Sequence, residues 1–127
     1  MIVISDTSPI TNLAAIGQLN LLQQLYSTIV IPVAVYREMV AVNKIVPGAI
    51  EVQTLSWIQT QTVADDRSVI EIQRNQDNID LGEAEAIILA LQIKADLLLM
   101  DERRGRTLAI QYGLNVTGLL GVLHPQN

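Results

Sequence analysis

Four short apolar runs constrain the fold of this chain more than any other feature of its sequence. They occupy residues 2–5, 28–31, 97–100 and, less strongly, 114–117, with the sequences "IVIS", "TIVI", "LLLM" and "LNVT". Each is nearly continuous in apolar residues rather than alternating, which is typical of strands buried on both faces of a parallel sheet. The segment 57–63, "WIQTQTV", could add a further strand.

Helical patterns separate these runs. The expected helices cover residues 8–16, 19–25, 32–42, 65–75, 81–94 and 102–112. Gly17 divides the first two, Pro32 is expected in the first turn of the third, and Gly113 is a plausible C-cap for the last. Strands that alternate with helices predict an α/β fold: a three-layer α/β/α sandwich with a central, mostly parallel sheet.

Composition narrows the class of protein. A chain of 127 residues fits one domain, residues 1–127, and 50% hydrophobic with 17% charged residues favours a folded chain. There is no cysteine, and the lone histidine, His124, lies close to the last residue. Disulfides and thiolate sites are excluded, and a serine-histidine-aspartate triad is disfavoured, so carboxylates remain as the chemical groups. No apolar run reaches the roughly 18 residues of a membrane span, which predicts a soluble cytoplasmic protein without membrane partners.

The formal net charge of −5 discourages a polyanionic partner, and the scarcity of aromatic residues argues against base-stacking platforms. If several of the acids surround a divalent cation, however, they no longer act as net negative charge at that site and need not repel a polyanion there.

Two aspartates directly follow predicted strands, Asp6 after "IVIS" and Asp101 after "LLLM". In an open parallel sheet the functional crevice lies outside the carboxyl ends of the strands, so both carboxylates are expected at the same edge. Aspartate is also a favoured helix N-cap. Each residue alone therefore has two interpretations, a cap or a ligand, and the pair favours a shared site.

Further acids stand at the start of the strongly apolar segment 81–94. Asp80 and Glu83 have the spacing of a capping box, while Glu83 and Glu85 diverge by about 200° around a helix and cannot face one cleft. Apolar residues on both faces leave open which glutamate points inward. Glu38, by spacing alone, is expected to be an exposed helix residue beside Arg37.

The order of these motifs carries a resemblance. The chain contains "ISDTSPITNLAAI", "IVIPVAVYREM", "DLGEAEAIILAL", "ADLLLMDERRGRTLA" and "GLNVTGLLGVL" in succession. In this it resembles PIN-domain proteins of the branch close to VapC-type toxin ribonucleases, including the "GEAEA" form of the third motif. The resemblance covers nearly the whole chain and implies an α/β/α sandwich similar to flap-endonuclease cores, in which clustered acids hold Mg²⁺ or Mn²⁺ for RNA hydrolysis.

Carried over residue by residue, the four family acids fall on Asp6, Glu38, Glu83 and Asp101. Many family members have an aspartate where this chain has Glu83. The resemblance leaves Asp80 as the N-cap, and Glu102 could join the site from its periphery. Hard divalent cations prefer oxygen ligands, and such an ion can activate water for attack on phosphorus, so neither histidine nor cysteine is needed.

Neighbouring polar residues are weaker candidates for substrate binding. Thr7 and Ser8 could orient a metal-bound water or the scissile phosphate, or could cap the helix that follows. Arg103 and Arg104, in the run "ERRGR" with Arg106, could reach phosphates or could form a solvated helix face.

The leading hypothesis is thus a metal-dependent endoribonuclease, the toxin of a toxin-antitoxin pair. The resemblance implies an RNA substrate, a small antitoxin partner and a homodimer. A second hypothesis is a PIN-like module that binds or regulates proteins with little nuclease activity. A third, a phosphohydrolase of small phosphoesters, lacks an evident nucleophile-and-base arrangement beyond these acids.

Overall fold

The computed structural model describes residues 1–125 and contains a five-stranded sheet in which every strand pair is parallel. The strand order is β3-β2-β1-β4-β5. The strands are β1 (Val3–Ser5), β2 (Ile29–Pro32), β3 (Ile58–Gln61), β4 (Leu97–Leu99) and β5 (Val116–Thr117). All five predicted strands are present, and the α/β fold with a parallel sheet is confirmed.

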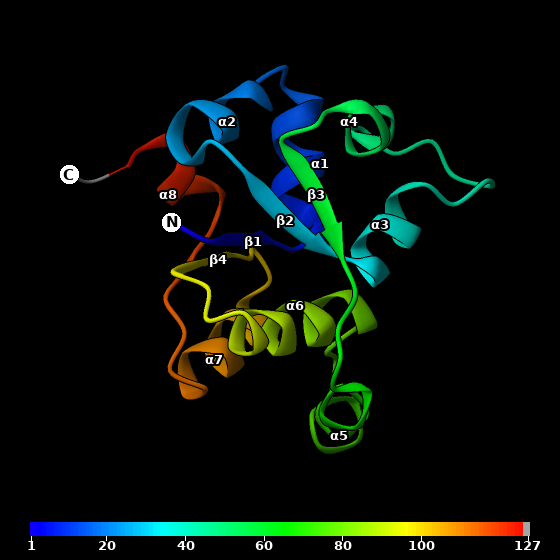
Figure 1. The fold of residues 1–127 in the computed structure, drawn as a ribbon, viewed down its shortest axis with the longest axis vertical. Helices are drawn as coiled ribbons and strands as arrows, with labels where there is room; N and C mark the ends of the chain where they lie inside the picture. Colours follow the sequence, from blue (N-terminus) through cyan, green and yellow to red (C-terminus); the bar gives the residue numbers. More distant parts are fainter. Residues whose placement is uncertain (126–127) are drawn as a thin grey trace.

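Helices cover both faces of this sheet (Figure 1). The helices are α1 (Thr7–Ala15), α2 (Asn20–Tyr26), α3 (Val33–Met39), α4 (Ala49–Thr54), α5 (Asp66–Asn75), α6 (Leu81–Gln92), α7 (Arg103–Gln111) and α8 (Leu119–Leu123). In Figure 1, α1, α2 and α4 lie on one side of the strands, and α6 and α7 lie on the other. Within residues 1–125 no helix is long and apolar enough to cross a membrane.

The core consists of two apolar clusters, one on each face of the sheet. Successive strand residues alternate between them: Val3 and Leu99 join the cluster beneath α1 to α4 and α8, and Ile4 and Leu98 join the cluster beneath α5 to α7. Because both faces are buried, the strands need apolar residues at every position, which explains their continuous apolar sequences.

Three details of the predicted elements were wrong. Pro32 is the last residue of β2, and α3 begins at Val33 and ends at Met39, short of Val42. Proline is tolerated at this point because its ring fixes φ near the observed −72°, and because α3, which begins at the next residue, does not need the N–H that proline lacks. The helices α4 and α8 were not predicted, since each spans fewer than two turns and shows too little periodicity.

Candidate functional site

The carboxyl ends of β1 and β4 bring the two strand-end aspartates to the same edge of the sheet. Ser5 pairs with Leu99, and the backbone N–H of Asp6 donates to Leu99 O at 2.9 Å, so β1 and β4 stay aligned beyond their last residues. Asp101 follows β4 after one intervening residue, Met100. The expectation that both aspartates lie at this edge is confirmed by the strand register.

Asp6 is a buried carboxylate without a capping role. It occupies the N-cap position of α1, but its side chain accepts no capping hydrogen bond, and only 5% of its surface is exposed. Burial raises the pKa of Asp6 to about 7; the backbone N–H of Thr7 opposes this, and the nearby carboxylates of Asp80, Glu83 and Glu38 add to it. The absence of a capping hydrogen bond argues against the interpretation of Asp6 as a helix cap and favours its interpretation as a metal ligand.

Glu38, on α3, lies near Asp6, and both carboxylates approach Gly82 at the start of α6. A Cβ atom added to Gly82 would lie 3.4 Å from both Asp6 Oδ1 and Glu38 Oε2, so the two carboxylates approach the same point of the backbone. Thr7 Oγ1 donates to Glu38 Oε2 at 2.9 Å and orients that carboxylate. The structure thus brings two of the predicted acids and one predicted hydroxyl residue together.

Glu83 belongs to the predicted capping box, which the structure contains. Asp80 Oδ1 accepts from the Glu83 N–H at 2.8 Å, and Glu83 Oε1 accepts from the Asp80 N–H at 3.0 Å. The other oxygen, Oε2, is buried and has no hydrogen-bond partner. Burial raises the pKa of Glu83 to about 7, opposed by the Asp80 backbone N–H and reinforced by the carboxylates of Asp80 and Glu102. Capping alone does not require a buried, half-satisfied carboxylate.

A glycine of α7 makes room for that unpaired oxygen. A Cβ at Gly105 would lie 2.7 Å from Glu83 Oε2 and 2.5 Å from Met100 Sδ. Since atoms at such separations overlap, Glu83 can occupy this position only because residue 105 has no side chain.

Asp101 is turned toward α8 and α1. Its Oδ1 accepts from the Leu119 N–H at 2.5 Å, and its Oδ2 accepts from Asn12 Nδ2 at 3.2 Å. Gly118 lies against the same carboxylate, because a Cβ there would be 3.0 Å from Asp101 Oδ1 and 2.8 Å from Arg106 Nη1. Asp101 therefore has a structural role in holding the start of α8, and the Arg106 guanidinium lies close to it.

The remaining candidates lie around this centre. Glu85 Oε1 accepts from the Ala34 N–H at 3.0 Å and caps α3, which removes it from the acid site. Glu102 and Arg104 line a hollow of about 610 Å³ together with Asp80 and Glu83. Arg103 is exposed on α7, and Ser8 lies partly buried in α1 with its carbonyl accepting from Thr11.

The donor atoms suit a hard divalent cation, although they are not gathered into one cluster. Within residues 1–125 no three carboxylate or imidazole groups lie close enough together to hold one ion. The ligands are nevertheless all oxygens, as Mg²⁺ and Mn²⁺ prefer. The orphaned Glu83 Oε2 and the raised pKa values of Asp6 and Glu83 indicate carboxylates whose ionised form is disfavoured by burial, and a bound cation would offset that cost.

Residues 2–126 match the model of the DUF3368 family, described as a PIN domain. The chain belongs to the PIN-domain family. Its members are typically nucleases and generally use divalent metals. A search of the curated proteins finds no match.

The PIN fold is also found in a solved structure that is similar to this chain. It is a PilT N-terminus domain protein from the hyperthermophilic archaeon Sulfolobus solfataricus P2, which superposes with a TM-score of 0.70 over 98% of this chain and 92% of that one. The sequence identity is 16%, so this similarity supports the fold alone.

Several residues around the candidate site were missed from sequence. Asn12, Gly82, Gly105 and Gly118 each contact or adjoin one of the predicted acids. The glycines in "LGEAEA" and "ERRGR" are placed inside or at the start of helices, where glycine is unfavourable, and that cost was a usable signal of close approach by another group.

Proposed function

We propose that this PIN domain is a metal-dependent endoribonuclease that hydrolyses RNA phosphodiester bonds, with Asp6, Glu38, Glu83 and Asp101 as the ligands of Mg²⁺ or Mn²⁺. One observation carries the proposal: two acids, Asp6 and Glu83, are buried at the carboxyl edge of the sheet with pKa values of about 7. Burying a carboxylate in this way costs free energy, and carboxylates with strongly raised pKa values cluster at functional sites.

The residues around the acids have distinct tasks in this proposal. Thr7 holds the Glu38 carboxylate beside Asp6, and the capping box holds Glu83 at one oxygen while leaving the other buried and without a hydrogen-bond partner. Asn12 and the Leu119 N–H fix Asp101. A divalent cation held by these acids would supply an activated water and would stabilise charge on the phosphate. Arg106, next to Asp101, can pair with a phosphate oxygen, as can Ser8 through its hydroxyl.

The finer assignment rests on the resemblance to VapC-type toxins. We propose that residues 1–127 act as a single nuclease domain in the cytoplasm, that the chain forms a homodimer, and that a small antitoxin neutralises it. A neighbouring gene for a small DNA-binding antitoxin, and neutralisation of the nuclease by that protein, would test this assignment.

RNA cleavage with and without metal tests the nuclease proposal. Purified protein should cleave RNA with Mg²⁺ or Mn²⁺, and EDTA should abolish cleavage. Asp6→Asn should lower the rate at least about 100-fold while the far-ultraviolet circular dichroism spectrum is unchanged, because it removes a ligand charge and keeps the shape of the side chain. The matched control is Asp65→Asn, an exposed aspartate of another helix start. Undiminished cleavage by a folded Asp6→Asn variant would contradict the assignment of Asp6 as a metal ligand.

The alternative is a catalytically weak PIN-like module that binds or regulates proteins. It is favoured by the lack of a closed three-acid cluster within residues 1–125 and by the engagement of both Asp101 oxygens. Calorimetric titration with Mn²⁺ separates the two proposals, since a folded sample that binds no Mn²⁺ supports the module. Comparing RNA with a generic phosphomonoester separates the nuclease from a phosphohydrolase.

A further inference from the structure

A hollow beside α7 lies outside the group of acids described above. It has a volume of about 320 Å³ and lies between α7 and the segment that connects α5 to α6. This volume is at the lower end of the range for small-molecule sites. Ile79 and Leu108, both buried, supply apolar lining, while the exposed Gln76, Gln111 and Arg103 supply polar groups.

The walls of this hollow are joined by a hydrogen bond. Arg104 Nη1 donates to the carbonyl oxygen of Asp77 at 3.2 Å, which links α7 to the connection between α5 and α6. The lining contains two arginines, Arg103 and Arg104, and one acid, Asp77, so it has a net positive charge. This is unusual in a chain of net charge −5 and suits an anionic ligand.

The hollow adjoins a second hollow that contains Glu83, one of the predicted acids. Ile79 and Arg104 line it and also line the neighbouring hollow that contains Asp80, Glu83 and Glu102. A polymer that carries phosphate groups and has one of them near Glu83 can therefore extend past Arg104 into the cationic hollow.

The lining chemistry fits a nucleotide. A base needs flat, weakly polar surroundings and hydrogen-bonding partners at its edge, and guanidinium planes can replace aromatic rings as stacking surfaces. Ile79 and Leu108 provide the apolar contact, the amides of Gln76 and Gln111 can donate and accept at a base edge, and Arg103 can pair with a phosphate.

We propose that this hollow binds one nucleotide of single-stranded RNA next to the scissile phosphate. The proposal rests on the proposed ribonuclease function and names the part of the substrate that the protein holds outside the acid site. It also explains how a chain with few aromatic residues holds RNA.

Binding of a fluorescent six-nucleotide RNA, measured by anisotropy in EDTA, tests this proposal without requiring cleavage. Arg103→Ala should weaken binding about tenfold and lower the salt dependence by about one counterion, since it removes a phosphate contact. Gln111→Ala, also exposed, should weaken binding about threefold without changing the salt dependence. Both variants should keep the wild-type melting temperature.

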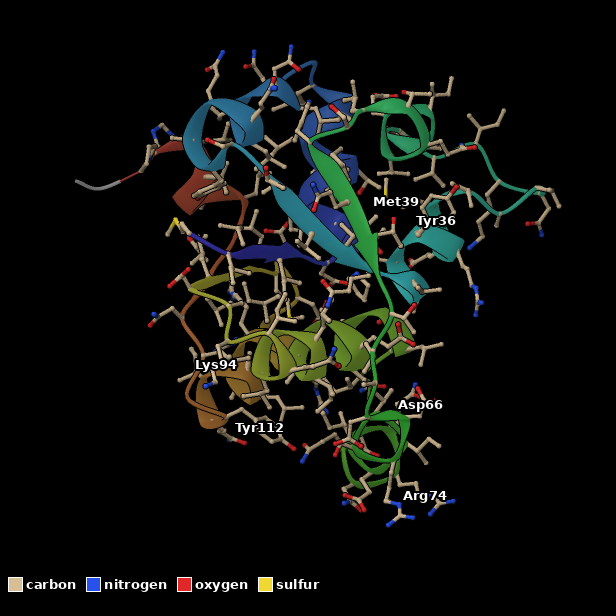
Figure 2. The ribbon with its side chains drawn as sticks, viewed as in Figure 1. Tyr36, Met39, Asp66, Arg74, Lys94 and Tyr112 are labelled. Atoms are coloured by element: carbon tan, nitrogen blue, oxygen red, sulfur yellow. The ribbon has the colours of Figure 1, made fainter. Side chains whose placement is uncertain are left out.

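The matched control is Arg74→Ala. Figure 2 shows Arg74 pointing outward from α5, away from the rest of the molecule, and its removal changes the net charge by the same amount. Binding should change less than twofold. Equal weakening by Arg74→Ala and Arg103→Ala, or no weakening by Arg103→Ala, would overturn the nucleotide site. Because the assay contains no free metal, wild-type protein that binds RNA in this way but fails to cleave it with Mn²⁺ would contradict the nuclease proposal alone.

Discussion

The helices α5 and α6 begin with the same device and use it differently. At α5 the N-cap Asp65 accepts from the Ser68 N–H at 3.1 Å and from Ser68 Oγ at 2.6 Å. The Ser68 hydroxyl and then its N–H hold the pKa of Asp65 below its ordinary value. At α6 the N-cap Asp80 accepts from the Glu83 N–H, but the third helical residue is now a buried acid whose pKa is raised to about 7.

The difference separates what a helix start needs from what the protein retains for another purpose. Ser68 completes the cap of α5 with a neutral, partly exposed hydroxyl, so every polar atom of the pair has a partner or reaches water. Glu83 completes the cap of α6 equally well with Oε1, yet it also leaves Oε2 buried and unpaired. A buried oxygen without a partner costs free energy that the cap itself does not require, and this supports the proposed site.

The largest effect that sharpens this comparison is the pH dependence of stability. The pKa values of Asp6 and Glu83 rise from 3.8 and 4.5 to about 7 on folding, so between these values the folded protein keeps protons that the unfolded chain has released. The free energy of unfolding should therefore fall as the pH rises from about 4 to 7 and should level off above that. Each of the two groups contributes a slope of at most about 1.4 kcal/mol per pH unit between its unfolded and its folded pKa. Urea unfolding in EDTA across this range measures it.

Glu83→Gln is the matched variant for this measurement, because glutamine keeps the capping hydrogen bond and removes the charge. The variant should lose part of the decline and be more stable than the wild type at pH 8. Adding Mn²⁺ at pH 8 should stabilise the wild type more than the variant. A flat profile for the wild type would contradict the account of a charge left unpaired by the α6 cap.

A smaller effect is expected from Gly105→Ala. Alanine is the better helix former by about 1 kcal/mol, so a protein without crowding at this point would be stabilised. The contacts with Glu83 Oε2 and Met100 Sδ should reverse the sign and lower the free energy of unfolding by about 1 kcal/mol. Repeating the substitution in a Glu83→Ala background should reduce the loss, and chemical denaturation of the four proteins gives the coupling. Stabilisation in both backgrounds would show that Gly105 does not make room for Glu83.

The smallest effect should come from the α5 cap. Asp65→Ala removes both hydrogen bonds to Ser68 and should lower the melting temperature by about 3 °C, without altering RNA cleavage. Thermal melting and a cleavage assay on the same sample check both parts. A loss of cleavage would show that the cap of α5 also affects the proposed acid site.

The fold could be largely predicted because its main determinants are local. Continuous apolar runs identify strands buried on both faces, and the strands of a parallel sheet carry Asp6 and Asp101 to one edge without further information. The capping box of Asp80 and Glu83 could also be predicted, since it depends only on spacing three residues apart.

The orientation of the acids could not be predicted, because it depends on tertiary packing. Both faces of α6 are apolar, so periodicity did not distinguish Glu83, which is buried beside α7, from Glu85, which caps α3. The bond between Asn12 and Asp101 joins residues 89 positions apart and has no local signature. The PIN-family order of motifs, rather than any physical pattern, raised Glu38 above an ordinary surface glutamate. Its carboxylate approaches the same glycine as that of Asp6, and its role as a metal ligand stays a prediction.

The hydrogen bond from the Leu119 N–H to Asp101 couples α8 to the acid edge of the sheet. Leu119 opens α8 and lies 18 residues after Asp101, so the orientation of this carboxylate depends on a helix outside the motif that contains it. Truncating the chain before Gly118 would remove this backbone donor while leaving the elements that carry Asp6, Glu38 and Glu83 intact. Damage to α8 would therefore reach the acid edge through the orientation of Asp101.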